Sequence, residues 1–340
     1  MGMGTFQQAF NKAVEILDDS EQTNKLFPWI LYDTDDDGDT VRKVIYHIGN
    51  RQFIDALGCD IEGNLSGLSI TVTEACTIKV NNNDVALVKG RNNISTFADE
   101  DKVNFNGNAD KVISIDFGGH TVNTGTGNER TVFFRDCVNM RSIRGVKIFG
   151  TLCNQMFGHG TIQNESLTQL VSAEIAAGTG LSNCLETDCQ QMFPYCRSLR
   201  HLDLSKAFLR PTSAKYMFKN CGVTVYDLRT FDMRSANNSL EMFNGAAINT
   251  LIVGDNFIMS TNNSGWWTNT EKDLTLVIIH NGTVQEQLVD SSNKVPWMYS
   301  GSGNFKFGTI KVPYGMVSTY QQMWHLPTNV TYIEYEEGDY

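Results

Sequence analysis

Met192-Phe193-Pro194-Tyr195-Cys196 is the first of three closely similar phrases in this chain of 340 residues. Met217-Phe218-Lys219-Asn220-Cys221 and Met242-Phe243-Asn244-Gly245-Ala246 follow it, so the phenylalanines recur at one constant interval. A short apolar run comes soon after each phrase, at Leu202–Leu204, Tyr226–Leu228 and Leu251–Val253. A repeat of about 20 to 50 residues is typical of a solenoid, and this interval falls within that range. Because solenoids chiefly provide extended binding surfaces, the repeat favours a binding or structural role over catalysis.

Degenerate copies extend the repeat in both directions. Earlier repeat phenylalanines follow one another at uneven intervals, at Phe105, Phe134 and Phe157. Apolar positions continue beyond the last phenylalanine at a nearly constant spacing, at Leu204, Leu228, Val253 and Ile278. The longest interval, between Phe157 and Phe193, holds an insertion, Ser166–Gly180, whose apolar residues follow a helical period. We expect this insertion to be helical and to lie on one face of the stack, as insertions in repeat proteins do.

The segments on either side of the repeats have patterns of their own. Residues 308–324 predict a strand and a short helix that would close the stack, and the acidic tail from residue 334 is expected to be exposed. Residues 41–98 show apolar alternation and turn residues typical of a small antiparallel β-unit. Residues 5–19 have the spacing of an amphipathic helix. That helix would pack on its own domain or dock as an arm on a neighbouring subunit.

Composition narrows the class of protein. With 41% hydrophobic and 19% charged residues, the chain is expected to be globular. A net charge of −11 without basic runs disfavours nucleic-acid binding. The chain has no apolar stretch of about 18 residues, so no transmembrane helix is expected. The first residues lack the features of a signal peptide, so we expect synthesis in a cytoplasm, with the protein staying there or leaving by assembly or lysis.

The cysteines follow the repeat. Cys137, Cys196 and Cys221 each lie three residues after a repeat phenylalanine, and Ala246 fills the same position in the next copy. A cysteine that alternates with alanine is best interpreted as a small buried apolar residue. No zinc-binding set surrounds Cys184 and Cys189.

The unit Met-Phe-x-x-Cys-x-Ser-Leu-x-x-Leu-Asp-Leu, complete from Met192 to Leu204, resembles the leucine-rich repeats of the BspA-like bacterial surface-protein family. The ending Ile310-Lys311-Val312-Pro313-Tyr314, followed by a segment with Tyr320 and Trp324, is similar to that family's terminal element. The resemblance covers about residues 105–335 and implies a leucine-rich-repeat solenoid with a C-terminal cap. Such repeats also occur in structural proteins of phages. This chain departs from the family in having few repeats, degenerate second and third copies, and no secretion signal.

We therefore predict a β-rich α/β fold in two parts. Residues 1–100 would form an N-terminal helix and a small antiparallel β-domain, a candidate anchoring domain, and residues 101–338 the solenoid with its cap. The expected function is non-enzymatic: a structural or attachment protein of a bacteriophage virion, tail- or head-associated. It would assemble as an oligomer with other virion proteins and contact a host-cell glycan or protein. The alternatives are a secreted or surface-displayed bacterial adhesin and, more remotely, a glycan-acting enzyme.

One acidic stretch is a candidate metal site. Residues 33–39 read Asp-Thr-Asp-Asp-Asp-Gly-Asp, which matches the opening of an EF-hand calcium loop. Position 12 of such a loop should be Glu, but here it is Val44. Five carboxylates in seven residues would repel one another without a cation. Calcium is thus the candidate cofactor, with ligands Asp33, Asp35, Asp37 and Asp39, and the alternative interpretation is a solvated acidic turn.

Two adjacent tryptophans are the candidate binding residues. Trp266 and Trp267 lie in a polar segment, Asn262–Asn269, where both rings could form a contact patch for a glycan or protein. The alternative is a loop tucked over the end of the solenoid. No catalytic residues are predicted, because the six histidines lie in unrelated contexts and no feature selects a pair of carboxylates.

Overall fold

The computed structural model divides the chain into two compact units, Met1–Leu65 and Ser66–Tyr340. In the first unit it describes three strands, and in the second it describes residues 67–124, 134, 136–158, 169–259, 266–267, 273–300 and 302–336. The division falls well before the boundary expected near residue 100, because the antiparallel strands up to Asn104 belong to the same unit as the repeats.

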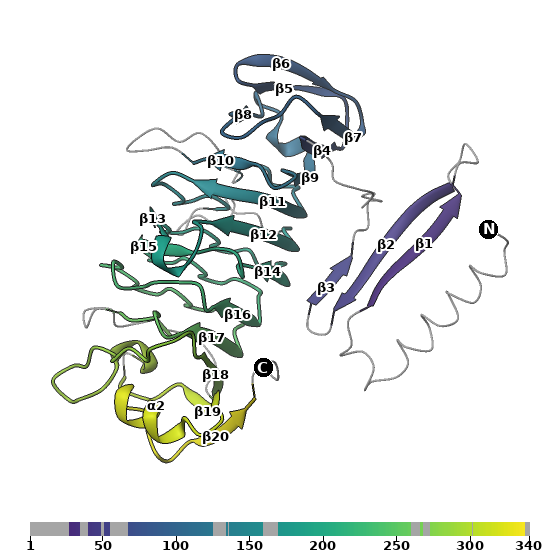
Figure 1. Cartoon of the computed structure of the whole chain (residues 1–340). Helices are drawn as coiled ribbons and strands as arrows, with labels where there is room; N and C mark the ends of the chain where they lie inside the picture. The colour runs from purple at the N-terminus through teal and green to yellow at the C-terminus, as the bar shows by residue number, and fades with distance from the viewer. Residues whose placement is uncertain are drawn as a thin grey trace. The chain divides into compact units, whose positions relative to one another are not determined.

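The described strands of the first unit form an antiparallel sheet. Its strands, in the order β1-β2-β3, are β1 (Phe27–Thr34), β2 (Thr40–Ile48) and β3 (Arg51–Ile54) (Figure 1). The helix predicted over residues 5–19 lies outside the described residues.

The second unit opens with antiparallel strands, as the alternation predicted. They are β4 (Leu68–Val72), β5 (Cys76–Val80), β6 (Asn83–Leu87), β7 (Gly90–Ile94) and β8 (Val103–Asn104). Asn81 and Asn82 join β5 to β6 with φ of 50° and 65°, the left-handed values that a two-residue hairpin turn requires and asparagine tolerates. β4 pairs antiparallel with β7 on one side and with β9 on the other, so it joins these antiparallel strands to the first parallel strand of the solenoid, and β7 is the edge of the sheet.

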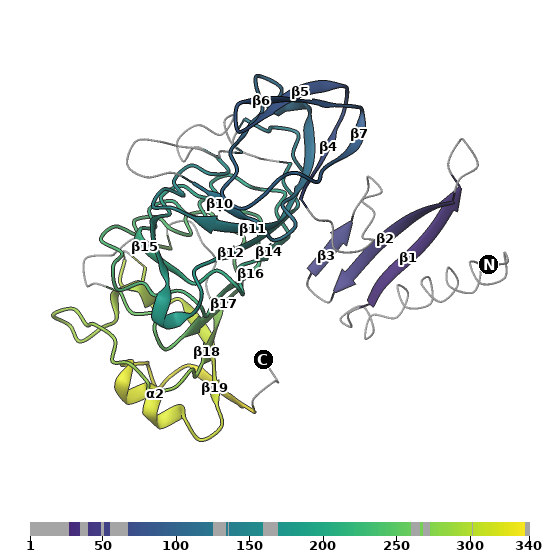
Figure 2. The ribbon, with the colours of Figure 1, turned by 45° about the horizontal axis from the view of Figure 1, so that its top comes forward.

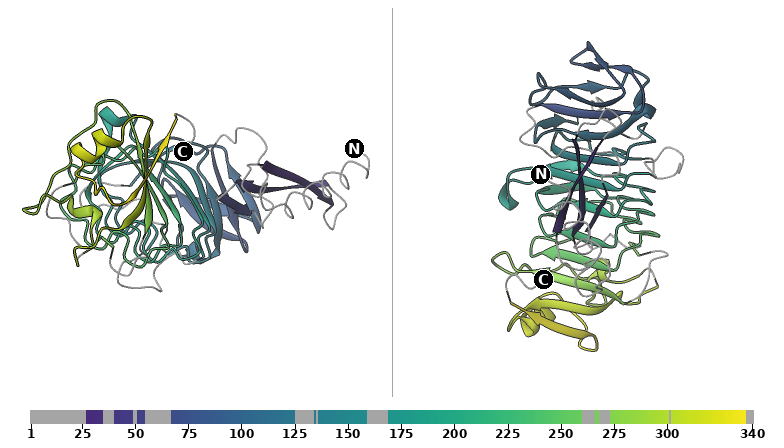
Figure 3. Two further views of the ribbon diagram at one scale, coloured as in Figure 1. Left: turned by 90° about the horizontal axis from the view of Figure 1, so that it is seen from below. Right: turned by 90° about the vertical axis from the view of Figure 1, so that its right-hand side faces the viewer.

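Parallel strands build the rest of the unit in chain order (Figures 1 and 3). The sheet that contains β4 and β7 continues with β9 (Val112–Asp116), β11 (Ser142–Phe149), β12 (Ser172–Ala177) and β14 (His201–Asp203). A second sheet contains β16 (Val225–Leu228), β17 (Thr250–Gly254), β18 (Leu274–Ile279), β19 (Phe307–Pro313) and β20 (Thr331–Tyr335). Leu228, Val253 and Ile278 are paired across three strands, which confirms the predicted register. The protein is therefore β-rich, with a β-solenoid that fits the expected repeat architecture in its broad form.

Shorter elements complete the turns. β10 (Thr121–Asn123) pairs parallel with the end of β11, and β13 (Leu185–Asp188) pairs parallel with β15 (Leu209–Ser213). Figures 1 and 2 show β15 on the side of the turns away from β12 and β14. The helical elements that the structure describes are short: three 3-10 turns, Ala109–Lys111, Leu181–Asn183 and Pro296–Met298, and α2 (Val317–Met323). Among the described residues, no helix has the length and apolar character that crossing a bilayer requires.

A ladder of phenylalanine rings forms the centre of the core. The rings of Phe157 and Phe193 stack at 4.6 Å, those of Phe193 and Phe218 at 5.9 Å, and those of Phe218 and Phe243 at 5.4 Å. Each backbone N–H also bonds to the next turn: Phe157 donates to the carbonyl of Met192, and Phe193 to that of Met217. Each repeated Met-Phe pair thus places two side chains in the core and contributes one hydrogen bond along the stack.

The cysteines of the repeat lie where the sequence predicted. Cys137, Cys196 and Cys221 are buried, as is Ala246 at the equivalent position. Burial raises the pKa of the Cys137 and Cys196 thiols well above the usual value, so both stay protonated near neutral pH. These residues act as small core side chains.

The helix predicted within Ser166–Gly180 is wrong. Part of this segment forms β12, in which Ala173, Ile175 and Ala177 are buried while Glu174 and Ala176 lie on the other face. In a strand, alternate side chains face the core, and here they are Ala173, Ile175 and Ala177. Packing of these side chains against the core outweighs the helical spacing of the apolar residues.

The C-terminal cap has the predicted strand and helix. Tyr320 and Trp324, within and just after α2, are fully buried against the last turns. In the described part of the tail, residues 334–336, Tyr335 departs from the expected exposure, because it is only 8% exposed. Its hydroxyl donates to the carbonyl of Ile278 at 2.6 Å, which holds the end of β20 across the neighbouring strands.

A buried carboxylate ties this cap to the stack, and we predict that Tyr320→Phe destabilises the protein. The Tyr320 hydroxyl donates to Oδ1 of Asp255 at 2.7 Å, while His280 Nδ1 and the Asn281 N–H contact Oδ2 at 3.0 and 2.9 Å. Burial and the nearby Asp255 charge raise the pKa of Tyr320, so it remains a donor. Loss of this donor should cost about 1–3 kcal/mol in the free energy of unfolding, measured in urea. Tyr314→Phe, at a side chain 75% exposed, is the control. Equal losses of unfolding free energy in the two variants would contradict a stabilising role for the hydrogen bond from Tyr320 to Asp255.

Candidate functional site

The structure does not place Trp266 and Trp267 on the surface. Their exposed fractions are 0% and 1%, so the predicted contact patch is wrong. The alternative interpretation, rings tucked into the end of the solenoid, agrees with this burial.

The two tryptophans are the next copy of the repeat. The Trp267 ring stacks on Phe243 at 5.1 Å with an interplanar angle of 7°, and the Phe243 N–H donates to the carbonyl of Trp266. Trp266 and Trp267 therefore occupy the Met and Phe positions of the following turn. Sequence reasoning missed this because the residue types differ, although the interval from Phe243 to Trp267 is close to the repeat length.

The predicted calcium ligands lie almost entirely outside the described residues. Asp33 belongs to β1, opposite Val41 of β2, and Asp35, Asp37 and Asp39 belong to the undescribed connection. The flanking elements are thus antiparallel strands, whereas an EF-hand loop lies between helices. Elsewhere, within the described part of the chain, no group of three or more His, Cys, Asp or Glu residues is placed to hold a metal ion. Calcium at residues 33–39 stays a prediction.

The structure brings together a set of charged residues that the sequence did not single out. They lie on the outer face of the first parallel sheet, one on each of four successive strands, and we call them the charged row: Asp116, Arg144, Glu174 and Asp203. Arg144 is paired opposite Asp116, and its Nε donates to Oδ2 of that residue at 2.7 Å. Glu174 is paired opposite Asp203. The alternate side chains of the same strands, such as Ile143 and Ala173, point into the core.

A β-bulge opens the charged row at its centre. The pairing of β11 with β12 shifts between Ile143 and Val146, and Gly145 adopts φ of 63°. A Cβ at Gly145 would come within 2.7 Å of the Asp116 carboxylate and 3.0 Å of the Gly118 backbone nitrogen, so glycine is required there. The bulge leaves a gap on the outer face where a side chain would otherwise stand.

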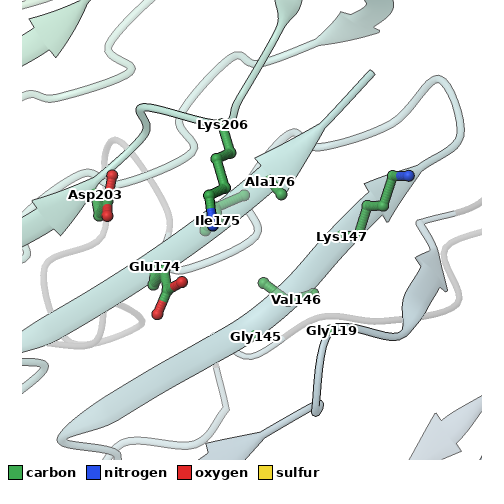
Figure 4. A pocket seen from close by; sticks show the side chains of 9 residues that line it. All are labelled: Gly119, Gly145, Val146, Lys147, Glu174, Ile175, Ala176, Asp203 and Lys206. Atoms are coloured by element: carbon green, nitrogen blue, oxygen red, sulfur yellow. The ribbon is translucent and has the colours of Figure 1, made fainter. Parts of the chain in front are cut away.

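A cavity of about 150 Å³ lies beside this bulge (Figure 4). We call it the Glu174 cavity, and its lining residues are Gly119, Gly145, Val146, Lys147, Glu174, Ile175, Ala176, Asp203 and Lys206. Figure 4 shows the carboxylates on neighbouring strands, the Lys206 ammonium over β12, and Lys147 extending the other way. Ligand pockets for drug-sized molecules are typically about 300–1,000 Å³, so this cavity has the size of a subsite.

The environment of the cavity changes the protonation of Glu174. Burial and the facing Asp203 carboxylate raise its pKa, and the Lys206 ammonium opposes that rise. Within the described residues, Glu174 forms no hydrogen bond or ion pair, so its carboxylate oxygens are available to a group that enters the cavity. Like charges directly opposite each other on paired strands are destabilising, which marks this pair as a candidate site rather than a structural one.

The next turn shows how the same position looks without a cavity. Asp227, which follows Asp203 by close to one repeat length, accepts hydrogen bonds from Arg229 Nε at 2.8 Å and Nη2 at 2.7 Å. Ser205 occupies the position after Asp203 that Arg229 occupies after Asp227. The Ser205 backbone N–H donates to Oδ1 of Asp203 at 2.9 Å. On the following strands the aligned outward residues are Ile252 and Val277, so the charged row gives way to an apolar face.

Comparison with protein-family models, curated proteins and solved structures gives no match for this chain. The likeness to BspA-like repeats therefore rests on the sequence motif alone.

Proposed function

We propose that the protein is a non-enzymatic structural and attachment protein, a component of a bacteriophage virion. The solenoid would present the charged row to a host glycan or protein, and the N-terminal unit would anchor it to neighbouring virion proteins. One observation carries the binding part of this proposal: the Glu174 cavity lies on the strands of a stacked, tightly packed sheet. Groups on strands backed by a packed core are held more rigidly than groups on loops, which favours recognition.

Two further features support the proposal. The repeated residues are used for packing, since the Met-Phe pairs form the ladder and leave the outer face to vary from turn to turn. The chain also divides into two compact units, an organisation suited to one part that anchors and one that presents. A secreted adhesin would use the same surface and differ in what the N-terminal unit contacts.

We expect the full chain to form a stable trimer, hexamer or larger assembly in light scattering. The measurement is made with and without calcium, and an Asp35→Asn, Asp37→Asn double variant is compared with the wild type. Assembly that needs calcium and is lost in the variant would identify residues 33–39 as an ion site. A monomer under all conditions would contradict self-assembly and leave the adhesin alternative.

A glycan-acting enzyme is the second candidate, and the paired Glu174 and Asp203 favour it. One carboxyl with a raised pKa beside a second carboxylate is the arrangement of a general acid and its partner. Release of reducing ends from a polysaccharide panel would support this function, provided that Glu174→Gln abolishes it. No release by the wild type would remove it.

A further inference from the structure

We infer that the Glu174 cavity, together with the exposed ring of Phe149, binds one neutral sugar ring of a glycan. This inference rests on the proposed attachment function and names the ligand class and the residues that would recognise it.

Hydrogen-bonding chemistry points to hydroxyl groups. The cavity walls combine acceptors, the Glu174 and Asp203 carboxylates, with a donor, the Lys206 ammonium. A sugar hydroxyl donates and accepts at once, so neighbouring hydroxyls on one ring satisfy both kinds of wall. Asp203 already uses Oδ1 for the Ser205 N–H, which turns the carboxylate into a fixed acceptor.

The shape of the cavity suits a ring that lies flat against the sheet. Gly119, Gly145 and Ala176 line it without long side chains, and a Cβ at Gly119 would meet open space. Phe149 is 47% exposed and follows Lys147 by two residues, on the same face of β11 and about 7 Å further along the strand. An exposed aromatic ring further along a strand that lines the cavity provides an apolar surface on which the C–H face of a sugar packs.

A cationic side chain from a protein partner fits less well. The two carboxylates would attract it, but the Lys206 ammonium lies close enough to Glu174 to oppose the rise in the pKa of that residue. The same ammonium would repel an arginine or lysine entering the cavity. A neutral polyhydroxylated ring meets no such repulsion.

The test uses the full chain on an array of neutral, amino-bearing and acidic glycans, followed by calorimetry with the neutral glycan that binds best. Two variants remove the site in different ways. Glu174→Gln keeps the shape and removes the charge, and Ala176→Phe fills the cavity from an outward-facing position. Because a hydrogen bond to a charged group is lost, we expect affinity to fall about tenfold or more in Glu174→Gln. Phe149→Ala should weaken binding about fivefold.

Asp227→Asn is the matched control, because it changes the equivalent aspartate one turn away, outside the cavity. Its affinity should equal that of the wild type. An array without neutral-glycan binding, or binding that Glu174→Gln and Ala176→Phe leave unchanged, would overturn the inference. Preferred binding of amino-bearing glycans or of a lysine-rich peptide would overturn it in favour of a cationic ligand. If the protein is a monomer but binds neutral glycans through these residues, the proposed virion assembly is contradicted and the binding site is supported.

Discussion

Trp267→Ala should lower the free energy of unfolding by about 3–5 kcal/mol, the usual cost of removing a fully buried large aromatic side chain. The Trp267 ring stacks on Phe243 and meets Phe307 edge to face at 5.6 Å. Its Nε1 also donates to the carbonyl of Trp297 at 2.6 Å. Truncation therefore opens a cavity in the ladder and leaves a buried carbonyl without this donor. Urea unfolding followed by circular dichroism measures the change.

Trp267→Phe separates the ladder from simple burial. Phenylalanine is the residue found at this position in the preceding turns, so most of the stacking should be recovered and the loss should be clearly smaller than in Trp267→Ala. The part that remains is the lost hydrogen bond to Trp297, about 1 kcal/mol. Equal losses in the two variants would contradict the assignment of Trp267 to the phenylalanine position.

Asp232→Ala should cost about 3 kcal/mol, the low end of the usual cost of breaking a buried ion pair. The Asp232 side chain is fully buried between two arginines: Arg210 Nε donates to Oδ2 at 3.0 Å, and Arg234 Nε donates to Oδ1 at 2.8 Å. Removing one partner is strongly destabilising because the remaining charges lose their compensation. We expect the low end of the range because Arg234 is 52% exposed and can be solvated. Asp227→Ala, at a carboxylate that accepts hydrogen bonds from Arg229, should cost about 1 kcal/mol or less.

The effect of Asp232 should depend on pH. Burial by itself would raise the pKa of Asp232, but the hydrogen bonds and charges of Arg234 and Arg210 outweigh it and hold the pKa below the usual value. A carboxyl whose pKa is lowered by folding stabilises the protein above the unfolded-state pKa, about 3.9, and loses that contribution as the pH falls through the folded-state pKa. The difference between wild type and Asp232→Ala should therefore be complete at pH 7 and shrink below about pH 4. A difference that stays constant down to pH 3 would contradict this account.

The repeat predicted the core of the solenoid because its chemistry is local. Phe193, Phe218 and Phe243 recur at one spacing, and a residue that recurs in a solenoid meets its own copy in the next turn. The register of Leu228, Val253 and Ile278 followed from the same argument. Trp266 and Trp267 were missed because the repeat was identified by residue type. The interval from Phe243 to Trp267 is close to the repeat length and would have placed both in the ladder.

The insertion shows why local patterns mislead in a degenerate turn. The apolar residues Leu170, Val171 and Ile175 suit a helix, while Ala173, Ile175 and Ala177 suit a strand. Two of the three strand positions are alanines, whose weak apolar signal hides the alternation. The packing of the adjacent turns decides between the two, and that information is not local.

The Glu174 cavity could not be predicted from single positions. The interval from Glu174 to Asp203 is longer than the regular repeat, so their pairing depends on the register across an irregular turn. The gap beside Glu174 and Asp203 depends on the bulge at Gly145, and the surrounding sequence has no pattern that predicts a bulge there. Sites of this kind arise from register and backbone shape together, and neither follows from a motif.

The central claim is that one stacked core runs through the repeat turns and holds the outer sheet face in place. Hydrogen exchange of the full chain, followed by mass spectrometry of peptides, tests it most directly. The account predicts slow exchange at the amides that bond from turn to turn, so that one protected peptide recurs in each turn, at Phe157, Phe193, Phe218 and Phe243. Fast exchange at these amides, or protection without that recurrence, would contradict the solenoid and the site built on it.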